Sequence, residues 1–145
     1  SSGGVFRTGQ MMQKHRPDWV ILALGANDGL RGSSLKSLRE NLQEMVRTIL
    51  DGGAKAILFG MKMPPNYGVA YTQGFERAYS AVASSAGVPL LPFFIDGVGG
   101  VPELNQADGL HPTAEGQEKI SKNICRFLSE TELFAEIGRT DADCS

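Results

Sequence analysis

The run WVILAL constrains the fold of this chain more than any other segment. It covers residues 19–24, follows Pro17-Asp18 and stops at Gly25. A continuous apolar run rich in branched side chains is typical of a strand that is covered on both faces, as strands in a parallel sheet are. We therefore predict a parallel sheet with helices packed against it.

Two further segments, residues 56–59 and 88–94, also have the composition of strands. Pro89 and Pro92 shorten the second of these, because proline cannot donate a hydrogen bond to a neighbouring strand. Helical patterns fill the gaps between the strands, and this alternation predicts a layered α/β sheet with right-handed crossovers. Without repeats or a second domain in the sequence, we assign residues 1–128 to one domain and 129–145 to a helix end and a polar tail.

Helices are predicted wherever apolar residues recur at spacings of three and four. Gly52-Gly53 and Gly87 follow two of these stripes, where a left-handed residue typically ends a helix. Thr113 precedes another, and its hydroxyl can cap the first turn. The predicted helices cover residues 5–15, 35–49 and 71–82, and a last one starts after Pro112-Thr113 and runs through Ile120, Ile124 and Phe127.

The overall composition excludes some partners. The net charge of −2 gives no electrostatic reason to expect nucleic acid or an anionic membrane. No apolar run approaches the roughly 20 residues that span a bilayer, so we predict no stable membrane insertion. The two cysteines, Cys125 and Cys144, match no metal motif. Cys125 lies in a helical pattern, which favours a buried free thiol over the alternative of a bridge to Cys144.

The segment GANDGLRG follows the first predicted strand, at an edge of the sheet where function collects in open parallel folds. We expect a loop whose glycines let the backbone turn sharply. The side-chain amide of Asn27 is a neutral donor that suits an oxyanion formed during acyl transfer. The alternative is a structural loop in which Asn27 and Asp28 only cap turns.

The segment ADGLHPT places Asp108 three residues before His111. Gly109 allows Asp108 to fold back, and Pro112 biases His111 away from helical geometry. One imidazole nitrogen can then bond to Asp108 while the other remains available, as a general base requires. A surface histidine beside a turn aspartate and half of a metal site are the alternatives. The only other histidine, His15, lies in a polar run before a proline, so we predict no metal site.

Taken together, GAND after a buried strand and DGLHP before the last helix resemble the third and fifth conserved blocks of the SGNH (GDSL-type) hydrolases. The segments MPPNYG, YTQGFERAY, VPLLPFF and DGLHPTAEGQ follow in the order of that family's bacterial acyl-thioesterase, lysophospholipase and arylesterase branch. The resemblance spans about residues 3 to 128. It implies a three-layer α/β/α, flavodoxin-like fold with the strand order 2-1-3-4-5.

The resemblance also implies a reaction and a role for each matching residue. A serine attacks a carboxylic ester or an acyl thioester, His111 takes its proton, and Asp108 holds the imidazole. Asn27 donates to the oxyanion, and Gly25 opens the block where a side chain would crowd the substrate. The implied substrate is a small acyl ester or thioester, and no cofactor is implied.

MPPNYG, residues 63–68, resembles a mobile segment that contacts substrate in this branch. By that resemblance Tyr67 lines an acyl pocket and belongs to the substrate-binding residues. The alternative is a rigid connection in which Tyr67 is half buried. The sequence leaves both interpretations open.

The match departs from the family at the nucleophile, because no serine of the sequence stands in a G-D-S context. Ser1-Ser2-Gly3-Gly4 resembles the stretch just after the second block. We therefore expect this chain to supply the last three strands, with the serine on a separate or cleaved N-terminal segment. The strand at residues 19–24 would then expose an unpaired edge.

Two functions remain in competition. The first is a serine ester hydrolase to which this chain contributes the acid, the base and one oxyanion donor. The second is a non-catalytic α/β domain that binds a ligand or a partner through its exposed edge. Relatives in the branch are commonly exported by bacteria, so the resemblance implies a periplasmic or secreted protein.

Overall fold

The computed structural model describes residues 1–131 and 133–136. Contacts divide the chain into two compact units, Ser1–Pro92 and Phe93–Ser145. The first unit contains the sheet, and the second contains the segment with Asp108 and His111.

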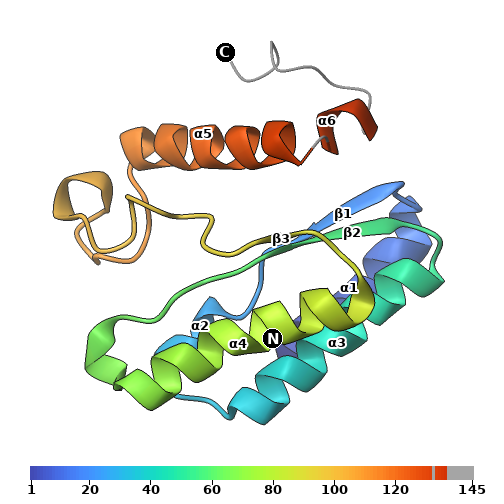
Figure 1. The fold of residues 1–145 in the computed structure, drawn as a ribbon, viewed down its shortest axis with the longest axis horizontal. Helices are drawn as coiled ribbons and strands as arrows, with labels where there is room; N and C mark the ends of the chain where they lie inside the picture. The colour runs from blue at the N-terminus through green and yellow to red at the C-terminus, as the bar shows by residue number, and fades with distance from the viewer. Residues whose placement is uncertain (132, 137–145) are drawn as a thin grey trace. The chain divides into compact units, whose positions relative to one another are not determined.

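The sheet of the first unit is parallel, as predicted. Its strands are β1 (Trp19–Leu22), β2 (Lys55–Phe59) and β3 (Leu90–Leu91), in the order β1-β2-β3 (Figure 1). Val20 pairs with Ala56, and Leu58 pairs with Leu90. Within the described residues, β1 pairs only with β2, so its other edge has no neighbouring strand.

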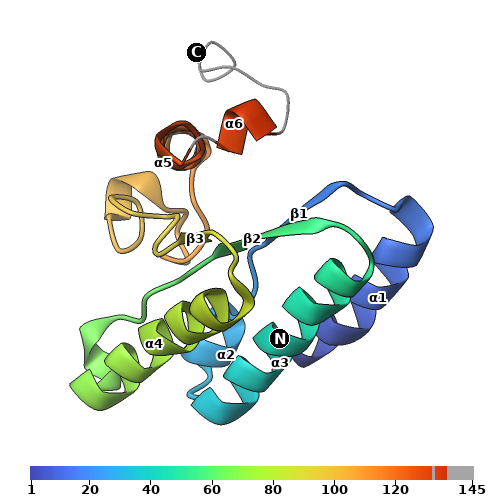
Figure 2. The ribbon, with the colours of Figure 1, turned by 45° about the vertical axis from the view of Figure 1, so that its right-hand side comes forward.

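Three long helices pack together on one face of this sheet (Figures 1 and 2). They are α1 (Ser2–His15), α3 (Leu35–Asp51) and α4 (Val69–Ala86). Burial of their apolar stripes against the sheet drives this packing, because about 25 cal/mol is gained for each Å² of apolar surface removed from water. The largest fully buried side chains of the unit are Tyr79, Phe75, Leu38, Leu42, Met45, Ile49, Ile57, Leu58, Val46 and Val82.

The glycines predicted to end two of these helices do so, although after α3 the left-handed residue is the second glycine of the pair. Ser34 caps α3 by accepting a hydrogen bond from the Ser37 amide at 3.3 Å. Gly52 keeps a helical φ of −75°, and the left-handed residue is Gly53, with φ of 83°. Gly87 ends α4 with φ of 65°, as predicted.

Two predicted strands are longer than the observed ones. The strand expected over residues 19–24 ends at Leu22, and the one expected over 88–94 contains only Leu90 and Leu91. The second is short because Pro92 has no amide hydrogen to continue the pairing with β2. The Gly60 amide, directly after β2, donates the last hydrogen bond of this pairing to the Leu91 carbonyl at 2.8 Å.

The second unit contains η2 (Pro102–Leu104), α5 (Ala114–Glu130) and α6 (Leu133–Glu136). Thr113 caps α5 as predicted, by accepting a hydrogen bond from the Gly116 amide at 3.2 Å. Asn105 is buried, and its side-chain amide donates to the carbonyls of Val98 and Val101 at 2.6 and 2.7 Å. The end of the predicted polar tail, residues 137–145, lies outside the described residues.

One prediction about the cysteines is wrong. Cys125 is half buried on α5 and forms a disulfide, so it is not a free thiol. The helical pattern around it showed where the backbone lies and carried no information about oxidation. Cys144 lies outside the described residues.

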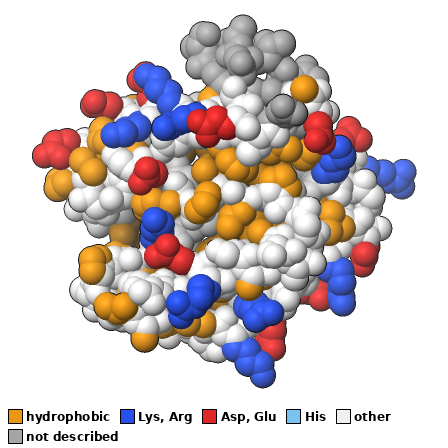
Figure 3. Space-filling model, viewed as in Figure 1, with side chains coloured by type: hydrophobic (Ala, Val, Ile, Leu, Met, Phe, Trp, Pro, Cys, Tyr) orange, Lys and Arg blue, Asp and Glu red, His pale blue; other side chains and the backbone are white. Residues whose placement is uncertain are grey.

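Charged side chains of both signs are scattered over the face drawn in Figure 3, among patches of hydrophobic side chains. None of the helices in the described part of the chain is both long and apolar enough to cross a membrane.

Candidate active site

The chain turns sharply after β1 and enters the short helix α2 (Ala26–Leu30), which contains Asn27. Gly25 makes this turn with φ of 119°, a conformation that residues with a side chain rarely adopt. The amides of Asp28 and Gly29 donate to the Gly25 carbonyl at 3.0 and 3.1 Å. The segment predicted as a loop therefore contains a short helix. Gly25 precedes its first residue, and the Gly25 carbonyl accepts the first hydrogen bonds of the helix.

The Asn27 side chain is exposed at the second position of α2. Among the described residues, its carboxamide has no hydrogen-bond partner, so both N–H groups are available to a ligand. A backbone of fixed geometry with an unengaged amide is the arrangement that oxyanion stabilisation requires, since the donor must be in place before charge develops.

Gly25 is buried, and the structure gives a second reason for glycine there. A Cβ at this position would lie 2.2 Å from the hydroxyl oxygen of Tyr79 and 3.0 Å from Leu38. The family resemblance predicted crowding of the substrate at this residue. The crowding observed within the protein is against Tyr79, on the side of the core.

Asp28 ties α2 to neighbouring helices. Its carboxylate accepts a hydrogen bond from the Ser1 hydroxyl at 2.9 Å. The Asn41 side-chain amide of α3 donates in turn to the Ser1 hydroxyl at 2.9 Å. The sequence contained no signal for this contact.

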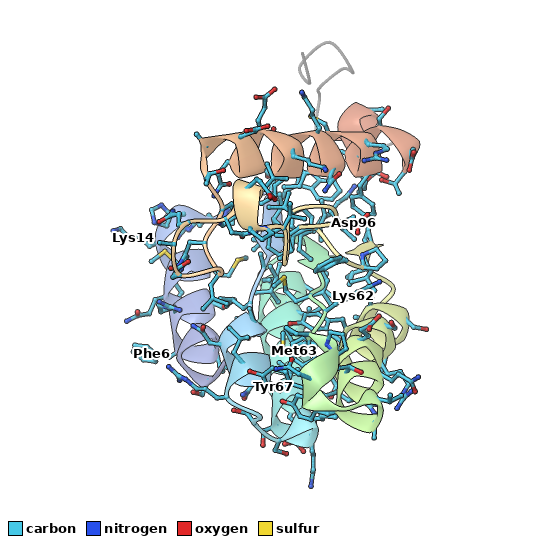
Figure 4. The ribbon with its side chains drawn as sticks, turned by 90° about the vertical axis from the view of Figure 1, so that its left-hand side faces the viewer. Phe6, Lys14, Lys62, Met63, Tyr67 and Asp96 are labelled. Atoms are coloured by element: carbon cyan, nitrogen blue, oxygen red, sulfur yellow. The ribbon has the colours of Figure 1, made fainter. Side chains whose placement is uncertain are left out.

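Tyr67 ends the short turn η1 (Pro65–Tyr67), close to Met63 (Figure 4). Its ring is half buried, and its hydroxyl donates to the carbonyl of Leu30, at the end of α2, at 2.8 Å. This half-buried position is what the interpretation of a rigid connection predicted. The contact links the segment of residues 63–68 to the helix that contains Asn27.

In the second unit, His111 and Asp108 are in direct contact. The distance between His111 Nδ1 and Asp108 Oδ2 is 2.6 Å. Because Nδ1 faces the carboxylate, Nε2 is the ring nitrogen that remains to accept a proton. The side chains of His111 and Asp108 are 72% and 45% exposed, so a substrate has access to both. The structure brings this predicted pair together.

Local hydrogen bonds shape the loop around this pair. The other Asp108 oxygen, Oδ1, accepts from the amides of Leu110 and His111 at 2.9 and 3.0 Å. Gly109 has φ of 68°, which lets the chain turn between the two partners. The Gln106 amide closes the loop by donating to the His111 carbonyl at 2.7 Å.

These bonds also fix the charge of Asp108. The hydrogen bond from the His111 amide, then those from the His111 ring and the Leu110 amide, hold the pKa of this carboxyl well below its usual value. Asp108 is therefore an anion at neutral pH. A carboxylate anion at Nδ1 favours the tautomer with the proton on Nδ1 and leaves Nε2 basic.

No group of three or more His, Cys, Asp or Glu side chains within residues 1–131 and 133–136 could hold a metal ion. A separate feature is a groove of about 550 Å³ that follows the unpaired edge of β1. Residues of α1 and β1 line it, among them Met11, Trp19 and Ile21. Ile21 is 50% exposed, which is unusual for the middle of a parallel strand.

Comparison with known proteins yields consistent matches. A family model described as GDSL-like Lipase/Acylhydrolase family matches residues 4–119. Esterase TesA of Pseudomonas aeruginosa is 42% identical over 124 residues, which are 86% of this chain and 62% of that protein. Thioesterase 1/protease 1/lysophospholipase L1 of Escherichia coli K12 is 35% identical over 128 residues, 88% of this chain and 62% of that protein. The chain thus spans less than two thirds of the length of these relatives.

A solved structure agrees with the sequence matches. The crystal structure of TesA superposes with a TM-score of 0.85 at 40% identity and covers 89% of this chain and 72% of that one. This likeness supports the predicted α/β fold of the flavodoxin-like class.

Proposed function

Because this chain belongs to the GDSL-like lipase/acylhydrolase family, we propose that it provides the acid, the base and one oxyanion donor of an ester hydrolase. The bond is a carboxylic ester or an acyl thioester. The observation that carries the proposal is the 2.6 Å contact between His111 Nδ1 and Asp108 Oδ2 in an exposed loop.

In the proposed reaction, a serine oxygen attacks the carbonyl carbon while Nε2 of His111 takes the hydroxyl proton. Asp108 keeps the ring oriented and stabilises the imidazolium that forms. The tetrahedral intermediate then expels the alcohol or thiol, which receives the proton from His111. Water repeats the cycle on the acyl-serine and releases the carboxylic acid.

Asn27 has the role of oxyanion donor in this proposal. Its unengaged, exposed carboxamide on a rigid turn supports the assignment. Gly25 allows that turn, and Tyr67 is proposed to contact the acyl group from the neighbouring segment, where its ring is half exposed.

We also propose that the serine comes from an extended segment that pairs with β1. The unpaired edge of β1, the apolar groove beside it and the half-exposed Ile21 support this proposal, since such edges recruit a further strand. Intact mass and N-terminal sequencing of the purified protein test it. A single 15.6 kDa species that is monomeric and active would contradict it.

A non-catalytic domain is the second candidate. It is favoured by one observation, that no serine of this sequence stands in a G-D-S context. In that case the β1 groove binds a ligand or a partner. Hydrolysis of p-nitrophenyl acetate, measured with and without an added N-terminal segment, separates the two functions, because only the hydrolase gains activity from the segment.

The two relatives suggest both substrate classes, because one is named an esterase and the other a thioesterase and lysophospholipase. We propose a periplasmic or secreted location for the protein. The disulfide at Cys125 supports this location, since disulfides persist in oxidising compartments and are rare in the cytosol.

The decisive test uses Asn27→Ala in the full-length protein. Removing one oxyanion donor typically costs roughly 100- to 1000-fold in turnover, so kcat on p-nitrophenyl acetate or an acyl-CoA should fall by about that factor. Gln10→Ala removes an exposed carboxamide from α1 and serves as the control with unchanged kcat. Full turnover in Asn27→Ala would remove Asn27 from the mechanism.

A further inference from the structure

Four aromatic residues form a continuous row along η1 and α4. They are Tyr67 of η1 and Tyr71, Phe75 and Tyr79 of α4. The three residues of α4 are spaced four residues apart, so they share one side of the helix. Ring centroids of successive members lie 6.2, 6.4 and 5.4 Å apart. The row contains all three tyrosines of the chain.

The three hydroxyl groups of this row donate to one short stretch of backbone. Tyr79 donates to the Leu24 carbonyl at 2.9 Å, directly before the turn at Gly25. Tyr67 donates to the carbonyl of Leu30, the last residue of α2, at 2.8 Å, and Tyr71 donates to the carbonyl of Ser33, three residues further on, at 3.0 Å. The bonds therefore bracket the helix on which Asn27 lies.

Two glycines remove the remaining space between α2 and the aromatic row. A Cβ at Gly25 would lie 2.2 Å from the Tyr79 hydroxyl. A Cβ at Gly29 would lie 2.3 Å from Met63 and 2.7 Å from Phe75. The backbone of α2 is thus pressed against the row and cannot shift toward it.

We propose that Tyr79 is a positioning residue for catalysis, which holds the Asn27 carboxamide in place through its bond to the Leu24 carbonyl. This inference rests on the proposed role of Asn27. The carboxamide has no partner of its own among the described residues, so the backbone of α2 determines where its N–H groups lie. The bond to Leu24 is the one nearest to the turn from which that helix starts.

The surroundings of Tyr79 keep its hydroxyl protonated and shielded from water, so it always donates its hydrogen bond to Leu24. Its side chain is 1% exposed, so water does not compete for the bond. Burial, and then the charge of Asp28, raise the pKa of Tyr79 far above its usual value. The hydroxyl therefore remains protonated over the whole range of pH in which an ester hydrolase works.

The test is a double-mutant cycle in the full-length enzyme. Tyr79→Phe keeps the ring and removes the hydroxyl. We expect kcat to fall about tenfold and KM to stay within about twofold, because a misplaced oxyanion donor weakens the transition state only. In the Asn27→Ala background the same substitution should change kcat less than about twofold, since the donor that it positions is gone.

Two further variants keep the result interpretable. Ser85→Ala removes a hydroxyl from the same helix, where it donates to the Val82 carbonyl at 3.1 Å, and should leave kcat unchanged. Tyr71→Phe removes a half-buried member of the row and should give a smaller loss of kcat with the same dependence on Asn27. If Tyr79→Phe fails to fold, Tyr71→Phe still tests whether the hydroxyl groups of the row act on kcat through Asn27.

An equal loss of kcat with and without Asn27 would overturn the inference, because it indicates a structural effect alone. Unchanged kcat in Tyr79→Phe would overturn it as well. Hydrogen exchange gives an independent measurement: the amides of Asp28 and Gly29 should exchange about tenfold faster in Tyr79→Phe, with α3 unaffected. Full turnover in Asn27→Ala would instead refute the proposed role of Asn27, and the exchange rates would still decide whether Tyr79 holds the turn.

Discussion

The turn with Asn27 and the loop with His111 are stabilised in different ways. Tyr79 reaches the carbonyl before the Asn27 turn from 55 residues away, whereas Asp108 and His111 bond across three residues. The first turn is part of a packed core, and the second loop maintains its shape by its own hydrogen bonds. An oxyanion donor must stay fixed while charge develops, and a long-range contact with the core provides that rigidity.

The Asn27 turn is also more deeply buried than the His111 loop. Gly25 is buried against Tyr79, while the side chain of His111 is 72% exposed. Substitutions at the buried glycines of the Asn27 turn should therefore affect folding and activity together. Substitutions in the His111 loop should affect activity with little effect on folding, and this contrast can be measured.

The largest effect is expected for His111→Gln. Loss of the general base should lower kcat by about 10⁴-fold or more, while the free energy of unfolding changes by roughly 0.5 kcal/mol or less at so exposed a site. Ester hydrolysis and urea unfolding of the full-length protein measure the two quantities. Gln10→Ala, at an exposed residue of α1 that does not line the groove, is the control with normal turnover. Normal kcat in His111→Gln would exclude it as the base.

Two glycine substitutions test the contrast in folding. Gly25→Ala places a Cβ 2.2 Å from Tyr79 at a φ of 119°, so strain and overpacking should lower the free energy of unfolding by about 3 kcal/mol. Gly109→Ala has a φ of 68° and nothing within 4 Å, so only backbone strain remains, about 1 kcal/mol. Urea unfolding compares them. Equal losses would mean that the Asn27 turn is no more tightly packed than the His111 loop.

The smallest effect is expected from acid. Asp108 has a pKa below its usual value in the folded chain, so its contribution to stability is complete above the unfolded value, near pH 4, and is lost as the pH falls further. Unfolding of the wild type and of Asp108→Asn between about pH 5 and pH 2 measures it. The wild type should lose slightly more stability than the variant over this range. Parallel curves would show that the loop bonds do not favour the anion.

Features set by neighbours in sequence could be predicted. The apolar stripe of residues 35–49 became α3, because its period alone decides which face is buried. The contact between Asp108 and His111 is likewise local, and Gly109 and Pro112 between and beside them indicate the turn. The family resemblance, carried by these short segments, is confirmed by the match over residues 4–119.

Features set by distant residues could not be predicted. The tyrosines were visible as a helical stripe, but their hydroxyl partners lie up to 55 residues away and are backbone carbonyls, which leave no pattern in a sequence. The segment GANDGLRG has the composition of a loop, and contact with Met63 and Phe75 at Gly29 accompanies its helical turn.

The single tryptophan and the tyrosines report on separate places. Trp19 lies on β1, beside the open edge and under the Lys55 ammonium, which is 4.8 Å from its ring centroid. Every tyrosine, by contrast, bonds to the backbone around α2. Tryptophan fluorescence therefore senses whatever binds along the sheet edge, and the tyrosine bands of an ultraviolet Raman spectrum sense the Asn27 turn. The molecule has two built-in optical probes, and neither requires a label.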